Sequence, residues 1–444
     1  MNSRAVALQV LEEFHRRGDS LDRCLEHGIR EAHVDHRDRR FVTELVKGTI
    51  RRQATLDHLI DHFVTTRRLS SGAPLRRILR LGAYQVLYLD RVPHHAAVNE
   101  AVKAAKADKR TASRAGMVNA VLRRVINCRS RLPLPSSENL PARLAVEHSH
   151  PEWLVRRWLQ RYGLAKAKAL MMFNNRNPTL FLRRKIRGLS RQQFEIAAGR
   201  LCAKPTGLNN LFYPLQLPFE RDQIAIFRDG HCTVQAPSSG WVVRLLDIEP
   251  DSLVLDLCCG PGGKTGLISE LLGPMGRVCA CDRSYRRVAM TLETVERMGL
   301  SNVLAAVADG CRPALDTRFD RVLVDAPCTA TGVFHRHPEA RWRRSPRDLH
   351  SLPRLQKQLL HGASTLVADG GLLVYATCSL EPEENQEVVG SFLEAHAEFR
   401  REDPPVQIPG TLLDLDGFLR ITPHDHGMDG MFGARLRRIR KAER

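Results

Sequence analysis

The sequence predicts an open α/β sheet in the C-terminal half of the chain, preceded by an all-helical bundle and a small α+β segment. Three observations support this fold class. A strand, a glycine turn and a helix follow one another at 253–272, four more apolar strands each end in a polar residue, and the first 130 residues repeat apolar positions with helical spacing. The predicted parts are a helical domain at 1–130, a linker at 131–150, a basic α+β subdomain at 151–231 and an α/β domain at 232–444.

The chain is organised around the glycine turn. The apolar strand Leu253–Leu257 breaks into a Gly-Pro-Gly-Gly turn, and a helix is expected from Thr265 onward. Such a turn presents backbone N–H groups at a helix N-terminus to a nucleotide-like ligand. Its Gly-Lys-Thr ending also resembles a phosphate-binding P-loop, but that loop requires a glycine where this chain has Cys258, so an NTPase is the weaker interpretation.

Polar residues follow the other predicted strands at the point where each strand ends. The strands at 277–281, 303–307, 321–324 and 372–375 lead into Asp282, Asp309, Asp325 and Cys378, respectively. Because ligands bind at the carboxyl edge of open α/β sheets, we expect these side chains to converge there. An acid at the end of the second strand suits the hydroxyls of a ribose.

The positive charge of the chain is distributed unevenly. The net charge is +19 overall, with +11 on residues 1–150, +10 on residues 151–231 and −2 on residues 232–444. A basic accessory surface beside a near-neutral α/β domain favours a polyanion such as nucleic acid, although a solvated surface is the simpler alternative.

The composition argues against several other classes. No apolar run is long enough to predict a membrane span, and the amphipathic N-terminus lacks the apolar region of a secretory signal. The 11 cysteines form no C-x-x-C pair, so we expect neither a metal site nor a disulfide framework, and a reducing cytoplasm is the expected compartment.

Four sequence blocks in the α/β half carry a family resemblance. They are DLCCGPGGKT at 256–265, ADG at 308–310, VDAPCTATG at 324–332 and YATCSLEPEENQEVV at 375–389, and PHDHGMDGMFGA at 423–434 looks like the last block of the same family. They resemble the RNA cytosine-5 methyltransferases of the NOL/NOP/Sun type. The resemblance implies a class I, Rossmann-like methyltransferase fold with S-adenosyl-L-methionine as cofactor.

A second resemblance lies in the helical half. The strings RRILRLGAYQVLYLDRVPHHAAVNEAVKAAK at 76–106 and MVNAVLRR at 117–124 resemble a NusB-like RNA-binding domain, in which Arg76, Arg77 and Arg80 either face phosphate or lie on a solvated helix face. Together the two halves point to bacterial enzymes that modify the cytosine-967 site of 16S rRNA. We expect a monomer that meets 16S rRNA before the small subunit is fully assembled. A tRNA substrate, another rRNA site, or an RNA-binding factor with an inactive methyltransferase half are the alternatives.

The resemblance assigns roles to two cysteines, and the chemistry suggests roles for two further residues. Cytosine C5 becomes nucleophilic only after a thiolate adds to C6, which is covalent catalysis by cysteine. By resemblance Cys378 is that nucleophile and Cys328 assists release of the product. Asp325 is expected to supply a proton near N3, and Lys264 to lie near both thiols and lower their pKa. Two alternatives stay open from the residues alone. Cys328 could be the nucleophile, as in DNA cytosine methyltransferases, or either cysteine could be a buried packing residue without a catalytic role.

The resemblance also implies a cofactor site. Asp282 would bind the ribose hydroxyls, Asp309 would contact the adenine amino group, and Arg287 and Asp325 are further candidates. The methionine part would be held by backbone groups of the turn, at Cys258, Cys259, Gly260, Pro261, Gly262, Gly263 and Lys264. The chain departs from the family at Ala236 (usually Asp), at Lys185 (usually Asn), and at Cys259 and Gly260 (usually alanines).

Overall fold

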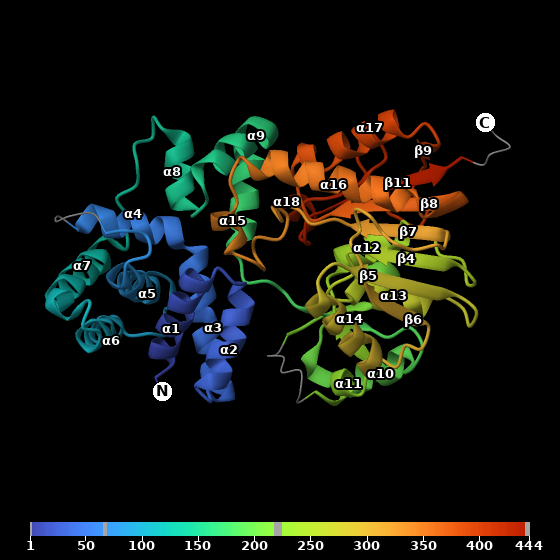
Figure 1. Cartoon of the computed structure of the whole chain (residues 1–444). Helices are drawn as coiled ribbons and strands as arrows, with labels where there is room; N and C mark the ends of the chain where they lie inside the picture. Colours follow the sequence, from blue (N-terminus) through green and yellow to red (C-terminus); the bar gives the residue numbers. More distant parts are fainter. Residues whose placement is uncertain (1, 65–68, 217–223, 440–444) are drawn as a thin grey trace. The chain divides into compact units, whose positions relative to one another are not determined.

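The computed structural model describes residues 2–64, 69–216 and 224–439, and these form two compact units (Figure 1). Unit 1 comprises Met1–Arg176 and Phe334–Arg343, and unit 2 comprises Asn177–Val333 and Arg344–Arg444. Residues 217–223 of the predicted basic subdomain and the last five residues of the predicted α/β domain lie outside the described residues.

Unit 1 is all-helical in its described part, as the sequence predicts. Short polar residues cap its first helices, since the side chains of Asn2, Ser20 and Asp35 accept hydrogen bonds from the first turns of α1, α2 and α3. Gly18 ends α1 in the left-handed conformation. The helices are α1 (Ser3–Arg17), α2 (Leu21–Glu31), α3 (His36–Arg51), α4 (Gln53–Phe63), α5 (Pro74–Tyr88), α6 (His94–Ala107), α7 (Ala115–Cys128), α8 (Leu140–Glu147), α9 (Glu152–Asn174) and α15 (Ala340–Arg343).

Helix α5 lies at the centre of this bundle and is buried along almost its whole length, arginines included. Arg76 is 3% exposed and donates to Asp57 at 3.0 Å and also to Asp61, while Arg80 donates twice to Asp57 at 2.7 and 2.6 Å. Arg77 donates to the carbonyl of Gly72 at 2.6 Å. Both predicted alternatives for these arginines, facing RNA phosphate and lying on a solvated helix face, are therefore wrong, because the side chains are buried and bonded inside the bundle.

The boundaries of unit 1 differ from the predicted domain limits. Helix α8 occupies the expected linker, and α9, which bends at Gly163, belongs to unit 1 and not to the basic subdomain predicted at 151–231. A segment of the predicted α/β domain, Phe334–Arg343, also belongs to unit 1. There the fully buried Arg341 donates to the carbonyls of Ser149 at 3.0 Å and Asn174 at 2.8 Å.

Unit 2 begins with a three-stranded antiparallel sheet in the order β2-β1-β3. Its small core contains Leu182, Phe194, Tyr213 and Phe227, and a capping box between Ser190 and Gln193 starts α10. The elements are β1 (Phe181–Arg184), α10 (Arg191–Ala198), β2 (Phe212–Pro214), α11 (Ala225–Arg228) and β3 (Cys232–Val234).

The main sheet of unit 2 has the order β10-β11-β8-β7-β4-β5-β6, and β9 pairs with β11. Strands β8, β7, β4, β5 and β6 are parallel, whereas β11 is antiparallel to β8. The strands are β4 (Leu253–Leu257), β5 (Arg277–Asp282), β6 (Val303–Val307), β7 (Phe319–Asp325), β8 (Val367–Thr377), β9 (Phe399–Arg401), β10 (Leu419–Ile421) and β11 (Met431–Arg438).

Helices cover both faces of the parallel strands, so successive strand residues enter different cores. Leu255 and Val322 pack with α16 and α17, whereas Val254 and Leu323 pack with α12 and α13. The helices are α12 (Pro237–Arg244), α13 (Gly263–Leu271), α14 (Tyr285–Arg297), α16 (Asp348–Ser364), α17 (Gln386–Ala395) and α18 (Pro423–His426). Within the described ranges, no helix is long and apolar enough to cross a membrane.

Candidate active site at the carboxyl edge of the main sheet

The strand register brings the two predicted catalytic cysteines together. Asp325 at the end of β7 is paired with Ala376 near the end of the neighbouring strand β8. Cys328 comes three residues after Asp325 and Cys378 comes two residues after Ala376, so both cysteines lie just beyond the same pair of residues. Their Sγ atoms lie 3.2 Å apart. Cys328 is buried and Cys378 is partly exposed.

Lys264 and Asp325 form an ion pair at the same edge. Nζ of Lys264, in the first turn of α13, donates to Oδ2 of Asp325 at 2.6 Å. Burial opposes the charged form of Lys264, but the Asp325 carboxylate outweighs it, so the pKa of Lys264 is raised. The pair therefore retains a proton at neutral pH, close to the cysteines in the fold.

The surroundings of Cys328 favour its protonated form. The contact with Cys378 and burial together raise the pKa of the Cys328 thiol well above its ordinary value. Cys328 is thus a neutral thiol at neutral pH and a poor nucleophile.

Backbone contacts fix the loops that carry the cysteines. The N–H of Gly332 donates to the carbonyl of Cys378 at 3.0 Å, and the Arg344 guanidinium donates to the carbonyl of Cys328 at 3.0 Å. Gly430 lies against Gly332 so closely that a Cβ at 430 would come within 2.7 Å of the Gly332 Cα. Gly430 of the C-terminal block therefore packs against the loop that follows Cys328.

The glycine turn packs against α14. A Cβ at position 260 would lie 2.4 Å from Cβ of Arg287, and Gly262, with a φ of 97°, lies against Thr291. The departure from the family at Gly260 is explained by this close approach to Arg287. Cys259 points to the hydroxyl of Thr291 at 3.6 Å, and burial raises the pKa of its thiol to about 12, so Cys259 is a packing residue.

A hollow of about 380 Å³ lies beside the turn, at the ends of β4, β5 and β7. Asp282 and Asp309 line its polar side, and Leu257, Leu355 and Leu359 line its apolar side. Acids beside an apolar wall suit a ribose and an adenine, so these residues fit the adenosine part of S-adenosylmethionine.

The hollow includes some of the predicted cofactor residues and not others. Asp282 accepts hydrogen bonds from the N–H groups of Ser284 at 2.9 Å and Gly260 at 3.4 Å, and Arg287 lies 3.7 Å from its carboxylate. Cys258, Asp282, Arg287 and Asp309 line the hollow, whereas Cys259, Gly260, Pro261, Gly262, Gly263, Lys264 and Asp325 do not.

Gln235 is a candidate that the residue-level prediction missed. Its Oε1 accepts from the buried Arg183 at 2.6 Å, and Arg183 also pairs with Glu270 at 2.6 Å. Its buried Nε2 has no hydrogen-bond partner among the described residues, and the side chain borders the open face of Gly263. A donor left free beside the glycine turn fits a carboxylate of the cofactor. The block HCTVQAPSS, which resembles a pocket-forming family block, was the available signal.

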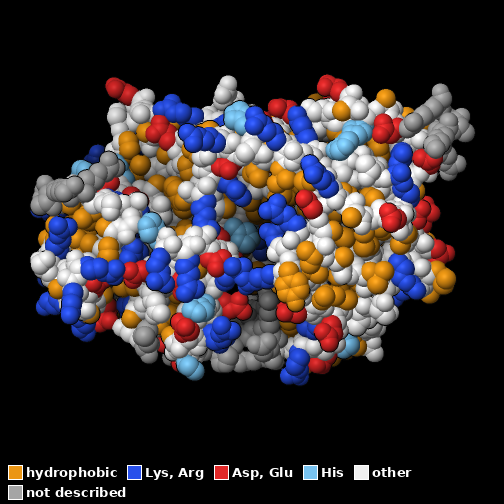
Figure 2. Space-filling view, in the orientation of Figure 1, with side chains coloured by type: hydrophobic (Ala, Val, Ile, Leu, Met, Phe, Trp, Pro, Cys, Tyr) orange, Lys and Arg blue, Asp and Glu red, His pale blue; other side chains and the backbone are white. Residues whose placement is uncertain are grey.

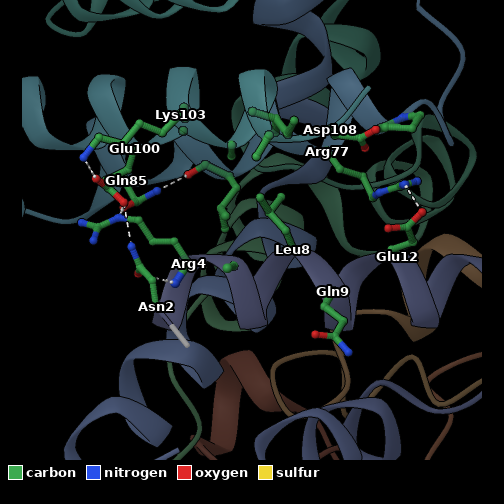
Figure 3. A pocket seen from close by; sticks show the side chains of 18 of the residues that line it. Asn2, Arg4, Leu8, Gln9, Glu12, Arg77, Gln85, Glu100, Lys103 and Asp108 are labelled. Atoms are coloured by element: carbon green, nitrogen blue, oxygen red, sulfur yellow. Dashed lines mark hydrogen bonds and ion pairs between the residues drawn. The ribbon is translucent and has the colours of Figure 1, made fainter. Parts of the chain in front are cut away.

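A second hollow, of about 430 Å³, lies between α1, α5 and α6 of unit 1 (Figure 3). Its charged rim is paired internally. Arg4 donates to Gln85 at 2.7 Å, Asn2 and Lys103 bond to Glu100, and Arg77 and Arg110 bond to Glu12. None of the predicted catalytic or cofactor residues lines it.

The sheet order, the glycine turn and the acidic strand ends define a Rossmann-like methyltransferase that uses S-adenosyl-L-methionine, joined to a NusB-type helical domain. Family models agree: one described as 16S rRNA methyltransferase RsmB/F matches residues 243–437, and a NusB family model matches residues 1–127.

Similar proteins extend the match over the whole chain. The probable ribosomal RNA small subunit methyltransferase B of Synechocystis sp. is 35% identical over 99% of this chain and 100% of its own. The protein of the same name in Bacillus subtilis is 32% identical over 98% of each chain. The crystal structure of PH0851 covers 97% of this chain and 98% of its own, with a TM-score of 0.81 and 25% identity. The chain belongs to the ribosomal RNA small subunit methyltransferase B family, and the predicted family, fold class and cofactor are confirmed.

Proposed function

We propose that this protein transfers a methyl group from S-adenosylmethionine to C5 of a cytosine in 16S rRNA, at the cytosine-967 type of site. The proposed substrate follows from the family, whose members are named for the small ribosomal subunit. We further propose that the enzyme acts as a monomer on rRNA before the subunit is fully assembled, when the target is still accessible.

The observation that carries the chemistry is the pair of thiols 3.2 Å apart at the carboxyl edge of the sheet. In the proposed mechanism the Cys378 thiolate adds to C6 and breaks the C5–C6 double bond. The pair of Lys264 and Asp325 holds the proton that neutralises charge near N3 as the adduct forms.

Release requires that the C5 proton leaves and that the C6–S bond breaks, which returns the electron pair to Cys378. The raised pKa of Cys328 supports its assignment to release, because a thiol that keeps its proton cannot compete with Cys378 for C6. Before release, C5 takes the methyl group, and the cofactor would leave as S-adenosylhomocysteine; Asp282 and Asp309 would hold its adenosine for this transfer, with Gln235 beside the turn.

The two cysteine variants test this assignment. We expect Cys378→Ala to form neither adduct nor product. Cys328→Ala should add through Cys378, transfer the methyl group and then stall, giving a slow-migrating protein–RNA band on a denaturing gel with S-adenosylmethionine present. The double variant should lack this band. The reverse pattern would exchange the two roles, and an active parent enzyme with no band in either variant would contradict the covalent mechanism.

The substrate is tested separately by bisulfite mapping of rRNA and tRNA from cells with and without the gene. Loss of one methylated cytosine in 16S rRNA is expected. A lost site in tRNA alone would replace the substrate while leaving the chemistry in place, and failure of the purified protein to bind S-adenosylmethionine would favour an RNA-binding factor instead.

A further inference from the structure

A buried carboxylate lies between the two loops that carry the catalytic cysteines. Glu384, at the end of a short 3₁₀ helix (Pro382–Glu384), has no exposed surface. A buried carboxylate is costly unless it is fully hydrogen-bonded, so its partners indicate what it does.

Both oxygens of Glu384 accept two hydrogen bonds. Oε1 accepts from the backbone N–H of Thr329 at 2.9 Å and from Nε2 of Gln356 at 3.1 Å. Oε2 accepts from the hydroxyl groups of Thr329 and Ser379. The four acceptor positions of the carboxylate are thereby filled.

The positions of these donors are informative. Thr329 is the residue that follows Cys328, and Ser379 is the residue that follows Cys378. Both are buried, and their hydroxyl groups also lie 3.1 Å from each other. One carboxylate therefore joins the two cysteine loops immediately after each thiol.

We propose that Glu384 is a positioning residue that sets the approach of Cys328 to Cys378. The proposal deepens the proposed function, on which it rests for the roles of the thiols. Glu384 does not line the cofactor hollow, and its hydrogen bonds go to groups beside the cysteines, so it acts mainly through the loops; its charge also adds to the effects of Cys378 and burial in raising the pKa of the Cys328 thiol. Displacing a reacting group by about 1 Å costs roughly 100-fold in rate, so the effect on turnover should be large.

The remaining contacts between the loops do not replace this carboxylate. Gly332 and Arg344 bind the carbonyls of Cys378 and Cys328, and Asn385 donates to the carbonyl of Ser379 at 2.9 Å. These contacts fix the backbone of each loop. Without the carboxylate, the Thr329 and Ser379 hydroxyls keep only their mutual contact at 3.1 Å and a longer one from Ser379 to the Thr331 hydroxyl at 3.4 Å, and the Thr329 N–H loses its acceptor.

The test measures how fast the two thiols form a disulfide, which depends on their approach and needs no RNA. Diamide oxidises two neighbouring thiols to a disulfide and is itself reduced to the hydrazine, which takes up the two protons. The full-length protein is treated with diamide, and the Cys328–Cys378 disulfide is followed over time by peptide mass spectrometry. We expect rapid formation in the parent protein, and at least tenfold slower formation in Glu384→Gln, whose amide can accept from only part of the donor set.

Three further variants make the result specific. Ser379→Ala and Thr329→Val each remove one hydroxyl arm and should slow the same disulfide by a smaller factor. They keep the test usable if Glu384→Gln does not fold. Glu387→Gln, an exposed position three residues on, makes the same chemical change outside the site and should behave like the parent.

Calorimetry with S-adenosylmethionine and steady-state kinetics complete the test. Unchanged cofactor affinity with a 10- to 100-fold lower kcat and little change in KM is expected for Glu384→Gln. Disulfide formation at the parent rate in Glu384→Gln and both hydroxyl variants would overturn the positioning role. Because the disulfide readout involves neither RNA nor methyl transfer, its failure is distinguishable from failure of the proposed function, which the cysteine adducts test.

Discussion

Two hollows, one in each unit, are lined by charged side chains, and they differ in what those side chains are bonded to. In unit 1 each charge at the α1–α5–α6 hollow has a partner from the same bundle, such as Arg77 with Glu12 (Figure 3). At the hollow of unit 2, Asp282 and Asp309 accept backbone N–H bonds, and Asp282 has one long ion pair with Arg287 at 3.7 Å. Beside the glycine turn, the Gln235 amide has a donor without a partner among the described residues.

This difference separates charge that stabilises a fold from hydrogen-bonding capacity that is kept for a ligand. Buried polar groups are normally satisfied, so a group without a partner at a strand end is evidence for a ligand there. Net charge alone would select the hollow of unit 1 as the ligand site, because unit 1 is the more basic part of the chain, whereas the hydrogen-bond partners favour the hollow of unit 2. The following predictions test the comparison, from the largest expected effect to the smallest.

The largest effect is expected on the stability of unit 1. Asp57→Ala removes the shared partner of the buried Arg76 and Arg80. Removing one member of a buried ion pair costs about 3–5 kcal/mol, and since Asp57 is 24% exposed we expect about 3 kcal/mol. Denaturant unfolding followed by tryptophan fluorescence measures it, because Trp153, Trp158 and Trp342 all belong to unit 1. Glu31→Ala, an exposed acid of the same unit, is the matched control and should change stability little. An equal loss in both variants would contradict the structural role of the buried arginines.

Much of the edge of unit 2 could be predicted from the sequence, because strand ends are local signals. The limits of β4 and β6 match the predicted strands, and the spacing of Cys328 and Cys378 from their strands places both at one edge once the strands are parallel neighbours. The partners of a buried residue are not local signals. Arg76 reads as a surface arginine on an amphipathic helix, and only the packing of α4 against α5 shows that Asp57 neutralises it.

The segment Phe334–Arg343 shows the same limit. By sequence it falls inside the predicted α/β domain at 232–444, yet Arg341 is fully buried in unit 1. The role of Glu384 was equally hidden, since its donors lie 55 and five residues away along the chain. Sequence patterns report which face of an element is buried, but not which distant group it meets.

A second prediction concerns Asp256, a buried acid of unit 2 whose described hydrogen-bond donor is the hydroxyl of Thr265. Burial beneath the glycine turn raises the pKa of Asp256 to about 7, and one of its oxygens has no partner among the described residues. A raised folded-state pKa means that the folded protein binds the proton more tightly, so stability falls as pH rises from about 4 towards 7. Asp256→Asn should remove this slope and gain about 2 kcal/mol relative to the parent between pH 5 and pH 8. Urea unfolding followed by circular dichroism at the two pH values measures the difference. A parent and a variant with parallel pH profiles would show that Asp256 is not destabilised by burial.

The third prediction compares the two hollows directly. Asp282→Ala should weaken binding of S-adenosylmethionine at least tenfold, because each ribose hydroxyl left without its acceptor costs about 1–3 kcal/mol. Glu12→Ala, an acid of the unit 1 hollow, should leave the affinity unchanged. Isothermal titration calorimetry on both full-length variants measures this. Unchanged affinity in Asp282→Ala would remove Asp282 from the cofactor site, and weaker binding in Glu12→Ala would end the distinction between the hollows.

The smallest effect concerns the exposed charge of unit 1. On the face shown in Figure 2, Lys and Arg side chains are interspersed with acids over unit 1, so the RNA footprint has to be found by substitution. Lys106 on α6 and Arg123 on α7 are exposed and line one further hollow of unit 1. If both contact phosphate, changing them to Gln should reduce the log–log salt slope of RNA affinity by about 1.4–1.8, at ~0.7–0.9 per phosphate contact.

The control is the exposed pair Arg354 and Lys357 on α16 of unit 2. Changing them to Gln should leave the slope within about 0.5 of the parent value, because the surplus charge lies in residues 1–231. Fluorescence anisotropy with a 16S rRNA fragment at several salt concentrations gives all three slopes. A larger reduction in the α16 variant would place the phosphate contacts on the methyltransferase unit and leave the basic surface of unit 1 without a role in binding.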